Sequence, residues 1–93
     1  MNQVSVRVRI IGRVQGVGYR GWTVRVAVVL GLSGWVRNRS DGSVEAVFQG
    51  GQNHIDKMID KLYQGPSGAV VSCVTFNYEK STKTLDFKQI STL

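Results

Sequence analysis

The dipeptide Asp41-Gly42 restricts the fold of this chain more than any other local feature, because it lies between two runs of strand-forming residues. The runs cover residues 35–40, WVRNRS, and residues 43–48, SVEAVF. Asp-Gly between two such runs is a strong short-range signal for a tight turn between antiparallel strands. The sequence therefore predicts a hairpin here. The residues expected on the outward face of its second strand are Glu45, Val47 and Gln49.

Hydrophobic spacing predicts further elements on both sides of this hairpin. Apolar and polar side chains alternate over residues 4–10, which is typical of a strand with one buried face. Residues 70–78 fit another strand, and residues 85–90 fit a short last one. Residues 55–62 instead carry apolar side chains at i, i+3, i+4 and i+7, and this spacing predicts an amphipathic helix.

The sequence defines two helices with unequal clarity. For the helix over residues 55–62, we expect Asn53 as the N-cap and Gly65-Pro66 as the stop. Residues 22–32 are ambiguous, because their valines favour a strand by propensity. At about eleven residues, however, the segment is longer than a usual strand, so we predict a helix. The start and stop residues that support this choice are Thr23 and Gly31.

Together these predictions give the order strand, helix, strand, strand, helix, strand and short strand. Two helices would then cover one face of a mostly antiparallel sheet, which is the split form of the strand-helix-strand unit. The fold class is therefore α+β. A chain of 93 residues has the length of one domain, and we expect that domain to span residues 1–93.

Positive charge is concentrated in the first forty residues, which hold all seven arginines and no acid. Residues 41–93 hold five lysines and six acids. The planar fork of an arginine matches phosphate oxygens, so this distribution suggests an anionic partner. The alternative is a basic face that only contacts solvent.

The sequence lacks the residues for a disulfide, a zinc site or a membrane span. Cys73 is the only cysteine, so neither an internal disulfide nor a spaced zinc site can form, and we interpret it as a small apolar residue in a strand. The first ten residues contain neither the apolar run of a signal peptide nor a membrane span. We therefore expect a cytoplasmic protein without membrane contact. We also expect a monomer. We interpret His54 as a surface residue, and Trp22 and Trp35 as packing residues.

The segment from Gly12 to Arg20, GRVQGVGYR, lies between the first strand and the first helix. Its glycines let backbone N–H groups turn around an anion, and the following helix would add its unpaired N–H groups. The spacing is neither the dinucleotide-binding fingerprint nor a Walker loop. A glycine-rich turn with no ligand is the alternative interpretation of this segment.

Two motifs resemble those of the acylphosphatase family. The first is the loop from Gly12 to Arg20, with Tyr19 where Phe is commoner. The second is Gly34-Trp35-Val36-Arg37-Asn38, followed by Asp41-Gly42. The resemblance continues over essentially the whole chain and implies a ferredoxin-like βαββαβ sandwich with a short fifth strand. The valine-rich first helix departs from the family, whose members usually carry more charged residues there.

The resemblance implies a function and a site. The expected function is hydrolysis of the carboxyl-phosphate bond of acyl phosphates, without a metal or cofactor. Arg20 would bind the substrate phosphate, and Asn38 would orient the attacking water. The loop residues implied in binding phosphate, and equally inorganic phosphate or sulfate, are Gln15, Gly16, Val17, Gly18, Tyr19 and Arg20.

Two other functions compete with this one. A nucleic-acid-binding module can share this order of elements, but it needs exposed aromatic residues on central strands, where this sequence places Ser5, Arg7 and Arg9. We therefore expect no nucleic-acid partner. A catalytically silent maturation or regulatory domain is the second competitor, and the intact Arg20 and Asn38 argue against it. Arg13, Arg37 and Arg39 would either steer anions or form a solvated face.

Overall fold

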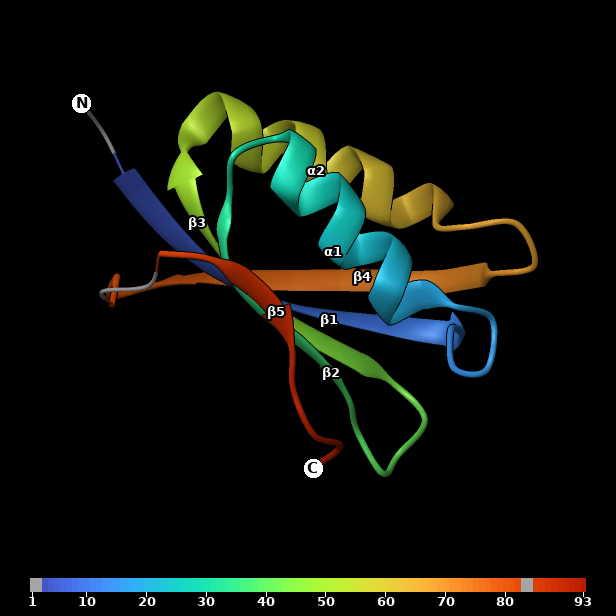
Figure 1. Cartoon of the computed structure of the whole chain (residues 1–93). Helices are drawn as coiled ribbons and strands as arrows, with labels where there is room; N and C mark the ends of the chain where they lie inside the picture. Colours follow the sequence, from blue (N-terminus) through green and yellow to red (C-terminus); the bar gives the residue numbers. More distant parts are fainter. Residues whose placement is uncertain (1–2, 83–84) are drawn as a thin grey trace.

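The computed structural model describes residues 3–82 and 85–93, so Met1, Asn2, Lys83 and Thr84 lie outside the described part. The predicted order of elements is confirmed. The elements are β1 (Gln3–Arg13), α1 (Tyr19–Val29), β2 (Ser33–Asn38), β3 (Val44–Gly51), α2 (Gln52–Gln64), β4 (Val70–Glu79) and β5 (Phe87–Gln89). Figure 1 shows both helices on one face of the sheet.

The described strands form a five-stranded sheet in the order β4-β1-β3-β2-β5. All neighbouring pairs are antiparallel except β2 and β5, which run parallel. The predicted α+β class and ferredoxin-like architecture are therefore confirmed. This topology places β2 beside β5. The helix α1 follows β1, which lies between β4 and β3.

The predicted hairpin joins β2 and β3, with Asn38 opposite Val44. At the turn, the Ser43 amide and hydroxyl donate to Asp41 Oδ1 at 2.9 and 2.6 Å. Short polar side chains that bond the main chain two residues on stabilise such turns. The turn chemistry therefore fixes the register that brings Asn38 to the end of its strand.

The core lies between the sheet and the two helices. From the sheet, it takes the alternating apolar residues of β1 and β3, which are fully buried. The amphipathic face of α2 is confirmed: its buried residues are Ile55, Met58, Ile59 and Leu62. Phe87 of β5 stacks on Phe48 with ring centroids 5.2 Å apart. Every element contributes at least one residue to this single cluster.

The side chains predicted to point outward from β3 are not exposed to solvent as expected. Glu45, Val47 and Gln49 are only 5%, 6% and 4% exposed. They lie on the face without helices, where Arg7 and Trp35 on the neighbouring strands pair with Val47 in the register. Long arginine stems and an indole ring cover apolar surface well, so this central strand is buried on both faces.

Both predicted helix starts are wrong. The first helix begins at Tyr19, and Thr23 is buried within it with its hydroxyl bonded to the Tyr19 carbonyl at 2.8 Å. The second begins at Gln52 with Gly51 as its N-cap, so Asn53 lies inside the helix. Its predicted stop at Gly65 is confirmed. In each helix a glycine, Gly18 or Gly51, occupies the N-cap position, and no side-chain cap from a described residue is formed.

Edge positions explain two further differences from the sequence interpretation. Cys73 is exposed in β4 and is not an apolar filler, because β4 is an edge strand that no helix covers on its outer face. Leu85 is fully exposed and precedes β5, while Phe87 is buried. His54 is exposed, as predicted. In the described part of the chain, no helix is long and apolar enough to cross a lipid bilayer.

Candidate active site

The loop between β1 and α1 has a backbone that glycine favours. Gly16 and Gly18 have φ of +77° and +79°, and a Cβ added at either would meet no atom within 4 Å. Space is therefore available at both positions, but the positive φ disfavours other residues. Turns of this kind direct successive N–H groups to one side, which creates a concave site for an anion.

The start of α1 adds unpaired donors to this loop. Gly18 is the N-cap, no side chain of a described residue caps the helix, and no acid lies in its first turn. The first helical hydrogen bond runs from the Trp22 amide to the Gly18 carbonyl at 3.0 Å. The N–H groups of the three residues before Trp22 thus have no partner within the helix, and no acid of its first turn compensates the positive end of the helix dipole.

A cavity of about 180 Å³ lies where the loop, the start of α1 and the end of β2 meet. Its lining residues are Val14, Gln15, Gly16, Gly18, Tyr19, Arg20, Gly21, Asn38 and Gln89. The structure therefore brings together five of the six predicted phosphate-binding residues with Asn38. The exception is Val17, which does not line the cavity and packs against the hydrophobic core.

Sequence reasoning missed three of the lining residues: Val14, Gly21 and Gln89. Val14 and Gly21 directly flank the predicted phosphate-binding residues 15–20, so a wider window would have included them. Gln89 lies in β5 and reaches the site because β5 runs parallel to β2. No local pattern in the sequence could have indicated that contact.

Arg20 is the second residue of α1, and its side chain is half-buried at the cavity. Within residues 3–82 and 85–93, its guanidinium forms no hydrogen bond or ion pair. A guanidinium carries five N–H donors in a planar fork that can contact two oxygens of one phosphate group. Arg20 can therefore give its donors to a bound anion without first breaking a contact in the protein.

Asn38 ends β2 and faces the same cavity. Its Oδ1 is buried and accepts no hydrogen bond from any described residue. A buried acceptor without a partner costs free energy, which a ligand or a water molecule at this position would recover. The side-chain amide can both accept from and donate to such a molecule while it remains uncharged.

Tyr19 contributes its main chain to the cavity, because its side chain points into the core. The residue is 1% exposed, and its hydroxyl donates to the Leu62 carbonyl at 2.5 Å. Burial raises the pKa of the Tyr19 phenol well above its ordinary value of 10.0. The phenol therefore stays protonated and serves to hold α1 against α2.

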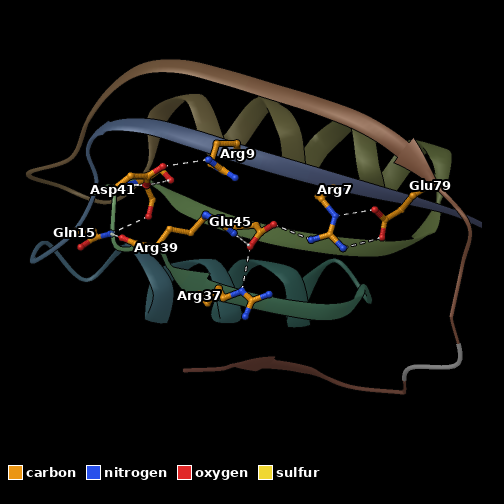
Figure 2. Close-up of polar contacts among 9 residues, drawn as sticks. Arg7, Arg9, Gln15, Arg37, Arg39, Asp41, Glu45 and Glu79 are labelled. Atoms are coloured by element: carbon orange, nitrogen blue, oxygen red, sulfur yellow. Dashed lines mark hydrogen bonds and ion pairs between the residues drawn. The ribbon is translucent and has the colours of Figure 1, made fainter. Parts of the chain in front are cut away.

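Glu45 holds three arginines on the face of the sheet without helices (Figure 2). Arg7, Arg37 and Arg39 each place a guanidinium nitrogen within 2.8 to 3.1 Å of its carboxylate. Burial would raise the pKa of Glu45, but the hydrogen bonds from these arginines outweigh it and lower the pKa below 4.5. The sequence left open whether Arg37 and Arg39 steer anions or form a solvated face. Both form ion pairs with Glu45, and neither lines the cavity.

The chemistry available to the site is limited to hydrogen bonding and one positive charge. None of the cavity-lining residues carries a carboxylate, imidazole or thiol. Such a site can bind and orient an anion and a water molecule. It offers no general acid for the leaving group, because the Tyr19 phenol points into the core and the other lining side chains apart from Arg20 do not titrate. The fold and the cavity define a small ferredoxin-like α+β protein whose glycine-rich loop and first helix line one cavity.

Comparison with known proteins gives the family. A family model described as Acylphosphatase matches residues 6–89. The chain is 57% identical over 70 residues to an acylphosphatase of Rhizobium etli, which covers 75% of this chain and 74% of that relative. The chain belongs to the acylphosphatase family.

Solved structures agree with this assignment. An acylphosphatase from Coxiella burnetii matches with a TM-score of 0.93 at 35% identity, over 96% of this chain and 94% of that chain. Full-length HypF in a phosphate- and nucleotide-bound form contains a similar fold, with a TM-score of 0.91 at 27% identity. That match covers 98% of this chain but only 12% of HypF. The same fold therefore also occurs as a small part of a much longer protein.

Proposed function

We propose that this chain hydrolyses the carboxyl-phosphate bond of acyl phosphates, releasing a carboxylate and inorganic phosphate. The observation that carries the proposal is that Arg20 and Asn38 line one cavity with the glycine-rich loop. Neither side chain has a hydrogen-bond partner among the described residues at the atoms the chemistry requires. Both are therefore available to a substrate and a water molecule.

In this proposal, the phosphate of the substrate occupies the loop. Main-chain N–H groups of residues 15–19 and the guanidinium of Arg20 would bind its oxygens. Tyr19 and Gln15 would contribute only their main chains, because their side chains are bonded elsewhere. Val17 would contribute at most its amide, since its side chain packs against the core. Inorganic phosphate or sulfate would bind in the same place.

The reaction needs little from the protein beyond position and charge. The carboxylate that leaves has a conjugate acid with a pKa of about 4 to 5, so it departs without a proton from a general acid. Water held by Asn38 attacks phosphorus, the bond from phosphorus to the acyl oxygen breaks, and its electron pair leaves with the carboxylate. A phosphate oxygen accepts the proton of the water. Arg20 and the loop amides stabilise the charge on the phosphoryl oxygens in the transition state.

A hydrolysis assay tests the proposal. Purified protein is mixed with benzoyl phosphate in the presence and absence of a metal chelator. We expect the same turnover in both, with competitive inhibition by inorganic phosphate. Loss of activity in the chelator would contradict the metal-independent mechanism, and no hydrolysis in either condition would contradict the function.

The two competing functions have less support. Nucleic-acid binding by stacking needs an open aromatic platform, but the guanidinium groups of Arg7 and Arg37 lie over the Trp35 ring, 5.4 and 4.6 Å from its centroid. A silent domain within a longer protein would not need unpartnered Arg20 and Asn38 in one cavity. Salt-dependent RNA binding without hydrolysis would favour the first competitor.

We also propose one domain over residues 1–93, active as a monomer in the cytoplasm. A single core that draws on every described element supports the one-domain proposal. The glycine-rich loop, Arg20 and Asn38 of one copy meet at the same cavity, which supports the monomer proposal. The single cysteine, which leaves no internal disulfide, fits a reducing compartment.

A further inference from the structure

Gln15 connects the glycine-rich loop to the β2-β3 hairpin through its side chain (Figure 2). Its Nε2 donates to the Arg39 carbonyl at 2.8 Å and to the Ser43 carbonyl at 2.9 Å. Two carbonyl acceptors can be satisfied only by the amide nitrogen, which has two N–H groups. The side chain of Gln15 is therefore committed to the hairpin and has no donor left for a ligand.

Both acceptor carbonyls keep a main-chain hydrogen bond without Gln15. The Arg39 amide donates to the Ser43 carbonyl at 2.9 Å, and the Gly42 amide donates to the Arg39 carbonyl at 3.1 Å. A carbonyl oxygen has two lone pairs and can accept both bonds. The turn therefore closes by itself, and loss of the Gln15 amide should leave the hairpin folded.

Asn38 depends on its main chain for its position, because its Oδ1 has no partner among the described residues. Its strand register places it opposite Val44, and its carbonyl accepts from the Leu93 amide at 3.1 Å. These contacts fix Asn38 to the sheet and to the C-terminal segment. Within the described part of the chain, Gln15 supplies the side-chain hydrogen bonds that join the loop to the hairpin directly after Asn38.

We propose that Gln15 is a positioning residue that sets the distance between the phosphate site and the water held by Asn38. This inference rests on the proposed function. In-line attack needs the water about 3 to 3.5 Å from phosphorus, and a shift of about 1 Å can cost roughly a hundredfold in rate. Gln15 acts through Asn38 and does not touch the reacting atoms.

The first test compares Gln15→Met with Gln52→Met. Methionine keeps the length of the side chain but removes both donors. We expect Gln15→Met to lower kcat roughly tenfold to a hundredfold. The inhibition constant for inorganic phosphate should change less than about threefold, because the phosphate site itself is intact. Gln52 is a matched control: its Nε2 also donates two bonds, to Asp56 Oδ1 at 2.8 Å and the Tyr78 hydroxyl at 2.9 Å, but it lies outside the cavity.

The second test is a double-mutant cycle with Asn38→Ala. If Gln15 acts through Asn38, adding Gln15→Met to Asn38→Ala should lower kcat by less than about twofold further. Equal losses in both backgrounds would overturn the inference, as would a Gln15→Met variant with the kcat of the wild type. Loss of phosphate affinity with unchanged kcat would also overturn it.

Gln15→Glu gives a readout that does not depend on the methionine variant. At neutral pH its carboxylate only accepts hydrogen bonds, so it repels the Arg39 and Ser43 carbonyl oxygens. On protonation it gains one O–H donor. We expect its kcat, relative to the wild type, to rise as the pH falls through the pKa of this carboxyl. A flat ratio in a folded variant would contradict the inference. An inactive wild type would contradict the proposed function, whereas an active wild type with an equally active Gln15→Met would contradict this inference alone.

Discussion

The hydroxyl of Tyr19 donates a 2.5 Å hydrogen bond to the carbonyl of Leu62, so the first residue of α1 is joined to the last turn of α2. Tyr19 also lines the cavity through its main chain. A contact between the two helices therefore supports the start of the helix that carries Arg20. This arrangement separates the structural part of Tyr19 from its proposed part in phosphate binding.

Tyr19→Phe removes the hydroxyl and keeps the buried ring. We expect the variant to lose about 1 kcal/mol of unfolding free energy, because the Leu62 carbonyl loses this donor. Turnover of benzoyl phosphate should stay the same, since the main chain at the cavity does not change. Urea unfolding and an activity assay measure both quantities. A stable variant with low turnover would mean that the hydroxyl takes part in the reaction.

Arg20→Lys replaces a planar fork with a point charge. Loss of a preorganised donor typically costs about 3 kcal/mol, so we expect kcat/KM to fall by a hundredfold or more. Binding of inorganic phosphate should weaken as well. Arg25→Lys is the matched control, because Arg25 is exposed in the same helix and does not line the cavity. Nearly normal activity in Arg20→Lys would show that charge alone is sufficient.

Asn38→Ala removes the group proposed to orient water. We expect kcat to fall by about a hundredfold while the inhibition constant of inorganic phosphate changes little, since the transition state loses an interaction that the bound phosphate does not use. Asn77→Ala, on an exposed strand outside the cavity, is the control. If Asn38→Ala lost phosphate affinity and kept its turnover, the roles of Asn38 and Arg20 would be reversed.

Stability should depend on pH through Glu45. Its pKa lies below the ordinary value of 4.5 in the folded chain, so the unfolded chain takes up the proton first. Its contribution is therefore complete above pH 4.5 and is lost as the pH falls through the lower folded-state pKa. Glu45→Gln should lower the free energy of unfolding by about 2 kcal/mol at neutral pH. It should also reduce the loss of stability at acid pH, which we call the acid limb of the stability curve.

Unfolding in urea between pH 2 and 7 (roughly the range over which carboxyls titrate) measures that dependence. Asp60→Asn is the control, because Asp60 is exposed on α2 and forms no ion pair with a described residue. It should leave the acid limb in place. An unchanged limb in Glu45→Gln would mean that other carboxylates dominate acid unfolding.

The valine-rich α1 can be stabilised by a small change. Val28 is 60% exposed within the helix, so its side chain gains little from burial. Alanine has a higher helix propensity, and Val28→Ala should stabilise the chain by about 0.5 kcal/mol. Thermal unfolding measures the shift. A drop in the unfolding midpoint of Val28→Ala would show that the exposed valine makes a contact in solution. Ala27→Val is the comparison: Ala27 is fully buried, so the larger side chain should lower the midpoint.

The sequence by itself determined the elements whose pattern is local. The Asp41-Gly42 turn and the apolar spacing of residues 55–62 predicted the hairpin and α2, because turn chemistry and helical periodicity act over a few residues. The family motifs also indicated Arg20 and Asn38, which the structure places in one cavity.

The tertiary structure decided everything that depends on a partner distant in the chain. It buried Glu45 under Arg7, exposed Cys73 at a sheet edge, and brought Gln89 into the cavity. It also gave the side chain of Gln15 two acceptors in the hairpin, which the loop motif did not indicate. The reason is physical: a residue's burial and hydrogen-bond partners are set by whichever strand or helix packs beside it, and local sequence does not specify that neighbour.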